Sequence, residues 1–280
     1  MRPADSFGIM NSSTRGVLPW AVLLLGATAG CALWLNLSGG NYQDFSPAIL
    51  VIGYAPALLA ILVALLWAGG VRELLGQLLR WRTGAQWYAI ALLGPFALTL
   101  AVTGILVATG TAAPTAVVVL PASAAFLGPL IAGSLGEELG WRGFAQARLQ
   151  SRLGPLPAAV LVGALWTLWH LWPLLTPLGR AETGPADIAQ SIVRLVSTAV
   201  IYAWLYNRSS LPVVLVAHAG HNLAIESMPP EVIGTAAGSM LVAVLYLAAA
   251  IAVVAFDREA WRRRPTASDG AAALERIRVS

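Results

Sequence analysis

Long apolar runs separated by short polar connections dominate the chain. A helix needs about 20 predominantly apolar residues to cross the hydrocarbon core of a bilayer. We interpret eight runs as membrane-spanning helices, at approximately residues 17–37, 47–69, 87–109, 115–136, 157–176, 187–206, 211–227 and 232–256. Arginines precede the first run, as in a secretory signal peptide, but its length and the spans that follow favour a retained helix. The pattern therefore predicts an all-α, polytopic membrane bundle.

One connection has a different pattern, because its leucines recur at helical spacing among arginines. In "VRELLGQLLRWRTGAQW", Leu74, Leu75, Leu78 and Leu79 alternate with Arg72, Arg80 and Arg82. This arrangement is typical of a short amphipathic helix that lies in the membrane interface. The alternative is a solvated loop.

Composition supports a membrane protein and excludes a nucleic-acid binder. Hydrophobic residues make up 58% of the chain and charged residues 11%, against about 25% charged residues in ordinary soluble domains. All seventeen basic residues are arginines, and all but Arg180 and Arg194 fall in the tails and in alternate short connections. By the positive-inside rule, both termini are expected in the cytoplasm of a multi-pass protein of the plasma (inner) membrane. No polar domain is long enough to hold a nucleic acid footprint.

The same pattern divides the chain into three parts. Residues 1–16 are expected to form a cytoplasmic tail, and residues 17–257 a bundle embedded in the lipid bilayer. The basic, alanine-rich tail 258–280 is expected to be disordered.

Two adjacent acids end the fourth span, in "GSLGEELGWRGF". An ionised acid at the centre of a membrane helix costs about 2.5 to 3.5 kcal/mol, so such residues normally face a partner or a cavity. Glu138 and Arg142 are four residues apart, in the order that favours an ion pair on one helix face. Glu137 points about 100° away and has no local partner. We therefore predict a structural role for Glu138 and a chemical role for Glu137.

The three histidines of the chain all lie in apolar spans. They are His170, His218 and His221, and Asn222 shares a helix face with His218. A carboxylate, imidazoles and a carboxamide together can activate a water molecule and stabilise an oxyanion, as amide hydrolysis requires. Glu137, His170 and His218 are also groups that bind zinc, although the His-Glu-x-x-His signature is absent. A buried histidine that merely completes a core hydrogen bond is the alternative interpretation.

Three short motifs resemble those of a known family. "EELGWR" (Glu137, Glu138, Arg142), "WTLWH" (Trp166, His170) and "HAGHN" (His218, Asn222) are similar, in this order, to the motifs of the CPBP family. This family comprises type 2 CAAX prenyl proteases and their bacterial relatives, also called Abi proteins. The resemblance covers about residues 120–225, and it departs at Trp166, where the motif has phenylalanine.

The resemblance implies an intramembrane endopeptidase whose cavity opens toward the cytoplasm and whose substrate is a membrane-anchored peptide or protein. By the family pattern, Glu137 and His170 activate the attacking water, while His218 and Asn222 form the oxyanion site. Glu138 and Arg142 brace the first motif, and Trp166 packs beside His170. Metal-dependent and glutamate-dependent chemistry both remain open.

Two other functions stay open at this point. Buried Glu, His and Arg residues also form proton relays, which would suit a proton-coupled transporter. A non-catalytic scaffold or immunity protein of the same family is the other alternative. His221 is expected to be a packing histidine, and Arg194 in the sixth span is expected to snorkel or to pair with Gln190 rather than to act as a counter-ion near the cavity.

The predicted spans contain one conflict of depth. Glu137 would lie near the cytoplasmic end of its span, whereas His170 would lie about 20 Å in from the start of the fifth span. A boundary must therefore be displaced, and we expect the "GPLPAA" opening of the fifth span to protrude from the membrane, with the fourth span starting deeper, near Pro121.

Overall fold

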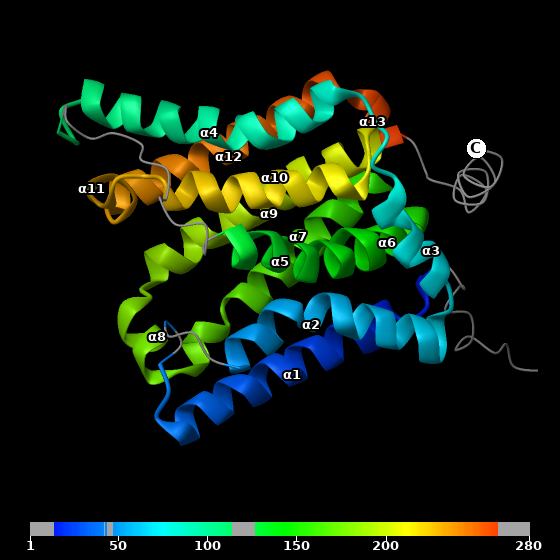
Figure 1. The fold of residues 1–280 in the computed structure, drawn as a ribbon. Coiled ribbons are helices and arrows are strands. Elements are labelled where there is room, and N and C mark those ends of the chain that lie inside the picture. The colour runs from blue at the N-terminus through cyan, green and yellow to red at the C-terminus, as the bar shows by residue number, and fades with distance from the viewer. Residues whose placement is uncertain (1–13, 42, 44–46, 114–126, 263–280) are drawn as a thin grey trace, which may run out of the picture.

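Helices account for the regular secondary structure of the described chain. The computed structural model describes residues 14–41, 43, 47–113 and 127–262. Its helices are α1 (Val17–Ser38), α2 (Pro47–Val63), α3 (Val71–Gly76), α4 (Ala85–Ala108), α5 (Leu127–Glu138), α6 (Ala147–Leu153), α7 (Pro155–His170), α8 (Pro177–Glu182), α9 (Pro185–Arg208), α10 (Leu211–Glu226), α11 (Pro230–Ile233), α12 (Ala236–Phe256) and α13 (Arg258–Arg262). No strand occurs in these described ranges. The predicted all-α bundle is confirmed (Figure 1).

Six helices are long and apolar enough to cross a membrane. They are α1, α4, α9 and α12, together with α2 extended to Ala68 and α7 extended to Leu175. Within the described residues, α5 and α10 are shorter, with 12 and 16 residues. Residues 115–126 of the predicted fourth span, including Pro121, lie outside the described residues. The count of eight spans therefore stays a prediction.

The helix of the predicted fourth span runs on beyond the two acids. Helix α5 does not end near residue 136 but continues through a π-helical stretch, Leu139–Gln146, into α6. Gly154, with φ of 86°, then reverses the chain, and Pro155 starts α7. A positive φ is readily adopted only by glycine. Glycine and proline thus form the sharp turn. The two acids, Glu137 and Glu138, do not interrupt the helix.

The helix that continues from α5 through α6 resolves the disagreement between the predicted depths of Glu137 and His170. Glu137 precedes Leu153 by 16 residues and His170 follows Pro155 by 15, so both lie about 22 to 24 Å from the α6–α7 turn. A side chain at Gly143 would contact Leu211, which places the start of α10 well short of that turn. Along the axis of the bundle, the α6–α7 turn therefore lies farther out than the start of α10. The expected protrusion of "GPLPAA" requires such an arrangement.

Small residues bring α5 close to α2. A Cβ atom at Gly136 would lie 2.6 Å from the carbonyl oxygen of Gly53, and one at Gly140 would overlap the carbonyl group of Pro56. Close backbone approach through small residues four positions apart is a common way to pack membrane helices. Trp20 of α1 donates a hydrogen bond to the Pro56 carbonyl oxygen at 2.9 Å, so α1, α2 and α5 form one packed unit.

The predicted amphipathic segment is helical over residues 71–79, as α3 and a following 3₁₀ turn. Leu74 is 1% exposed, whereas Leu75 and Leu79 are exposed. Gln77 donates a hydrogen bond to the Gly143 carbonyl oxygen at 3.0 Å. The helix is confirmed, and its position in the membrane interface stays a prediction.

The two ends of the described chain lie at one end of the bundle, beside α3 and α6 (Figure 1). The turn before α1 packs against Ala68 and Phe144. At the other terminus, Arg208 pairs with Asp257 at 3.1 Å and with Glu259 at 3.0 Å. The expectation of disorder is wrong for the first five residues of the carboxyl-terminal tail, which form α13 because these ion pairs hold them; residues 263–280 and 1–13 lie outside the described residues.

Candidate active site

Arg142 is the centre of a fully buried charge cluster. Its guanidinium group donates to Glu138 Oε1 at 3.0 Å, and both side chains are 0% exposed. The same group lies over the rings of Trp166 at 4.7 Å and Tyr202 at 4.9 Å. The predicted ion pair is present, and two aromatic faces further stabilise the cation.

Glu138 also reaches across to α10. Its Oε1 atom lies 2.8 Å from His218 Nδ1, so one carboxylate oxygen contacts both Arg142 and His218. A hydrogen bond at Nδ1 fixes the orientation of an imidazole and leaves Nε2 for another partner. The sequence indicated the local pair, but it gave no signal for a contact between residues 80 positions apart.

Glu137 has a partner on α7. Its Oε2 atom accepts a hydrogen bond from Trp166 Nε1 at 2.8 Å. The Trp166 ring also packs edge-on against His170 and His218, with centroids 5.1 and 5.7 Å apart. Trp166 was expected only to pack, as phenylalanine would. Its indole N–H gives it a polar contact that phenylalanine cannot make.

His170 lies at the last residue of α7 and is partly buried. Its Nδ1 atom lies 3.2 Å from the carbonyl oxygen of Trp166, and its ring packs against Trp169 at 4.8 Å. As in His218, contact at Nδ1 leaves Nε2 available. The Trp166 ring therefore separates His170 from His218 and touches both.

Asn222 is partly buried one helical turn after His218. Within the part of the chain that the structure describes, its side chain makes no hydrogen bond to protein. Direct contacts therefore join Glu137, Glu138, Arg142, Trp166 and His218, while His170 joins them through Trp166. Asn222 is related to this group only by its position on the same face of α10 as His218.

Three polar residues, His221, Tyr246 and Arg194, form a separate group beside this cluster. His221 lies 2.6 Å from the Tyr246 hydroxyl through Nδ1 and 3.5 Å from Arg194 Nη1 through Nε2. Gln190 donates to Asp187 at 3.0 Å instead of pairing with Arg194. The expected pairing of Arg194 with Gln190 is therefore wrong, because the acid at position 187 lies one turn before Gln190 and accepts from it.

The side chains do not fit a three-ligand zinc site in this conformation. No group of three His, Cys, Asp or Glu residues within the described ranges lies close enough to share a metal ion.

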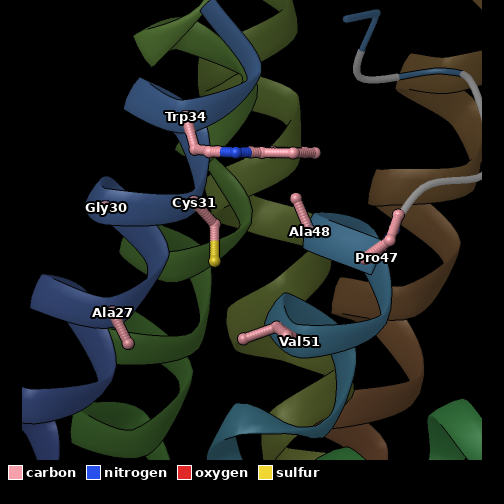
Figure 2. A pocket seen from close by; sticks show the side chains of 7 residues that line it. All are labelled: Ala27, Gly30, Cys31, Trp34, Pro47, Ala48 and Val51. Carbon is pink, nitrogen blue, oxygen red and sulfur yellow. The ribbon is translucent and has the colours of Figure 1, made fainter. Parts of the chain in front are cut away.

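Two apolar cavities flank the bundle. One, of about 320 Å³, lies between α1 and α2 and contains no residue of the charge cluster (Figure 2); its lining is Ala27, Gly30, Cys31, Trp34, Pro47, Ala48 and Val51. The other, of about 300 Å³, lies among α4, α9, α10 and α12. Tyr202, Ala217 and Tyr246 line it, so it borders the cluster beside His218.

Comparisons with known proteins agree with the three motifs. Residues 119–224 match the family model described as type II CAAX prenyl endopeptidase Rce1-like. CAAX prenyl protease 2 of Methanococcus maripaludis is 31% identical over 143 residues, which are 46% of this chain and 49% of that protein. The chain thus matches about half the length of this relative. Residues 119–224 are thus similar to the Rce1-like type II CAAX prenyl endopeptidases, in the region that carries the three motifs.

Proposed function

We propose that the protein is an intramembrane endopeptidase that hydrolyses a peptide bond of a membrane-anchored peptide or protein. The observation that carries this function is the pairing of Glu137 with Trp166 beside His218, which Glu138 holds by its Nδ1 atom. A free carboxylate oxygen and an oriented imidazole on facing helices are the groups that water-mediated amide hydrolysis needs.

Glu137 is the general base in this mechanism. It takes a proton from water as the water oxygen attacks the carbonyl carbon of the substrate. His170 accepts a hydrogen bond from the same water through Nε2 and so orients it. Trp166 keeps one oxygen of Glu137 engaged, which directs the other oxygen to the water.

His218 and Asn222 stabilise the tetrahedral intermediate. With Nδ1–H facing Glu138, donation from Nε2 to the oxyanion requires the imidazolium form of His218. The Asn222 amide supplies a second donor from the same helix face. When the intermediate collapses, the carbon–nitrogen bond breaks, and the proton held by Glu137 passes to the leaving amine. One preorganised donor of this kind contributes about 10²- to 10³-fold to the rate.

The substrate class follows from the position of the site in an apolar bundle. The Methanococcus maripaludis relative is named a CAAX prenyl protease. For this chain we propose only a membrane-anchored peptide or protein, together with location in the plasma (inner) membrane and both termini in the cytoplasm.

Cleavage of a library of quenched, membrane-anchored peptides by the purified protein in detergent tests the function. We expect products that mass spectrometry assigns to a single bond class, and we expect Glu137→Ala to form none. A parallel reaction with a chelator separates glutamate-dependent from metal-dependent chemistry. A folded wild type that cleaves no member of a broad library would contradict the proposal.

A further inference from the structure

Arg194 is a cation in the interior of the long apolar helix α9, and it has no acidic partner among the described residues. It follows the start of α9 at Pro185 by nine residues and precedes its end at Arg208 by fourteen, which are distances of about 14 and 21 Å along the helix. None of the carboxylates in the described part of the chain forms an ion pair with it. A charge at this depth is costly and normally marks a functional site.

The groups around Arg194 supply no compensating negative charge among the described residues. His221 Nε2 lies 3.5 Å from its guanidinium, a long contact, and His221 is held by the Tyr246 hydroxyl at 2.6 Å. Thr198 Oγ1 donates to the backbone carbonyl of Arg194 at 2.8 Å. A guanidinium without an acidic partner among the described residues suits an anion. The Arg194 side chain is only partly buried, so part of it remains accessible.

This group lies next to the catalytic residues. His221 follows His218 by three residues on α10 and directly precedes Asn222. Through its 3.5 Å contact with His221 Nε2, Arg194 lies within one side chain of the part of α10 that carries His218 and Asn222. An anion held at Arg194 would therefore lie beside a substrate whose scissile bond is at Glu137 and His218.

We propose that Arg194 binds a carboxylate of the substrate, close to the scissile bond, and so selects peptides that bring a negative charge into the site. This assignment rests on the proposed endopeptidase function. Arginine suits a carboxylate because its planar fork can donate two parallel hydrogen bonds. The carboxylate comes either from the free end of the peptide or from an aspartate or glutamate side chain. A lipid phosphate suits the position less well, because headgroups stay at the interface.

Binding of one peptide library in three chemical forms tests the assignment. Membrane-anchored peptides are prepared with a free terminal carboxylate, with a terminal carboxamide, and with Asp and Glu replaced by Asn and Gln. They are incubated with immobilised Glu137→Gln protein in detergent, which prevents cleavage, and retained peptides are quantified by mass spectrometry. Arg194→Gln and Arg194→Lys are compared in the same background. Arg180→Gln is the matched control, because Arg180 is exposed on α8 and donates a hydrogen bond to the Leu174 carbonyl oxygen, away from the site.

The expected result is a preference for one carboxylate form of roughly tenfold to hundredfold, as one charge-assisted interaction supplies. Arg194→Gln should abolish the preference, Arg194→Lys should keep part of it, and Arg180→Gln should leave it unchanged. Equal retention of all forms, no retention at all, or a preference that survives in Arg194→Gln would overturn the assignment. If Arg194→Gln does not fold, the three peptide forms are still compared in the parent Glu137→Gln protein, and equal retention there would overturn the assignment.

Cleavage of the same peptides by the wild type separates this test from that of the enzyme function. Cleavage without a carboxylate preference in binding would reject only the role of Arg194. A carboxylate preference without cleavage would reject only the endopeptidase.

Discussion

Trp166 joins the proposed catalytic groups, because its ring contacts Arg142, His170 and His218 while its N–H donates a hydrogen bond to Glu137. Its shape and its hydrogen bond can be separated by mutation. The phenylalanine typical of the family motif keeps most of the ring packing and removes the donor.

We expect Trp166→Phe to lower the cleavage rate by about tenfold, the effect of losing one hydrogen bond to a charged group, without unfolding the protein. Trp169→Phe is the matched control, because Trp169 Nε1 donates to Thr28 on α1 at 3.1 Å, away from Glu137. Both rates are measured on one cleaved peptide, with thermal unfolding in detergent as the folding check. Equal rates for the two variants would show that the bond to Glu137 has no role.

Glu138 contributes to stability through Arg142, which is fully buried. Removing one partner of a buried ion pair leaves an uncompensated charge and typically costs about 3 to 5 kcal/mol. We therefore expect Glu138→Ala to lower the melting temperature strongly or to abolish expression, as size-exclusion chromatography and thermal unfolding would show.

The double variant Glu138→Gln with Arg142→Met supplies the control. It removes both charges, and replacing both partners by groups of similar volume is often close to neutral. The double variant should be more stable than Glu138→Gln alone. If the single variant is as stable as the wild type, the ion pair has no structural role.

The sequence identified most of the residues that contact one another in the candidate site. Helical spacing predicted the pair of Glu138 and Arg142, and the chemistry of rare polar residues in apolar spans selected His170 and His218. The links from Glu138 to His218 and from Glu137 to Trp166 join different helices. No local pattern encodes such links, because they depend on how the helices are rotated against one another.

At the scale of elements, glycines determine how closely α5 approaches α2. Gly136 and Gly140 face the backbone of Gly53 and Pro56, whereas a Cβ atom at Gly133 would meet nothing within 4 Å. Three glycines on one helix thus differ only in their surroundings.

We expect Gly140→Ala and Gly136→Ala each to destabilise the bundle by about 1 to 3 kcal/mol, the usual cost of overpacking a core. Gly133→Ala should be neutral or stabilising, since alanine favours helix by up to about 1 kcal/mol over glycine. Thermal unfolding in detergent compares the three variants. A loss of stability in Gly133→Ala equal to that in Gly140→Ala would contradict the close packing of α5 on α2.

The same element shows why span boundaries are hard to predict. Hydrophobicity falls after residue 136, so the sequence indicated an end to the span there. The helix continues because Glu138 and Arg142 are paired and buried inside it, and Trp141 and Phe144 pack against Trp20. The π-helical stretch at Leu139–Gln146 follows the two acids directly, as is frequent at functional sites.

At the scale of the whole molecule, the described chain starts and ends at one end of the bundle (Figure 1). That arrangement requires an even number of crossings, which agrees with the charge pattern of the connections. The class of fold and the order of the long helices were predicted from apolar length alone, since lipid admits few alternatives to helices. The positions of the helices along the bundle axis were not predicted from apolar length, because they depend on the long α5–α6 helix.

We expect reporter proteins that fluoresce only in the cytoplasm to be active when fused to either terminus. A reporter inserted between α8 and α9, after Glu182, should be silent, since this connection lies at the opposite end from α6. Fluorescence at one terminus only would contradict an even number of crossings. Fluorescence only from the insertion would reverse the orientation.

We propose that the Glu137 carboxylate activates water inside a membrane bundle. The most direct measurement is the cleavage rate of Glu137→Gln relative to wild type on a peptide that the wild type cleaves, with Glu226→Gln as the control at the exposed end of α10. We predict a fall of about 10²- to 10⁴-fold, the contribution of a general base, with an unchanged melting temperature and no effect of Glu226→Gln. A Glu137→Gln protein that cleaves at the wild-type rate would contradict the account.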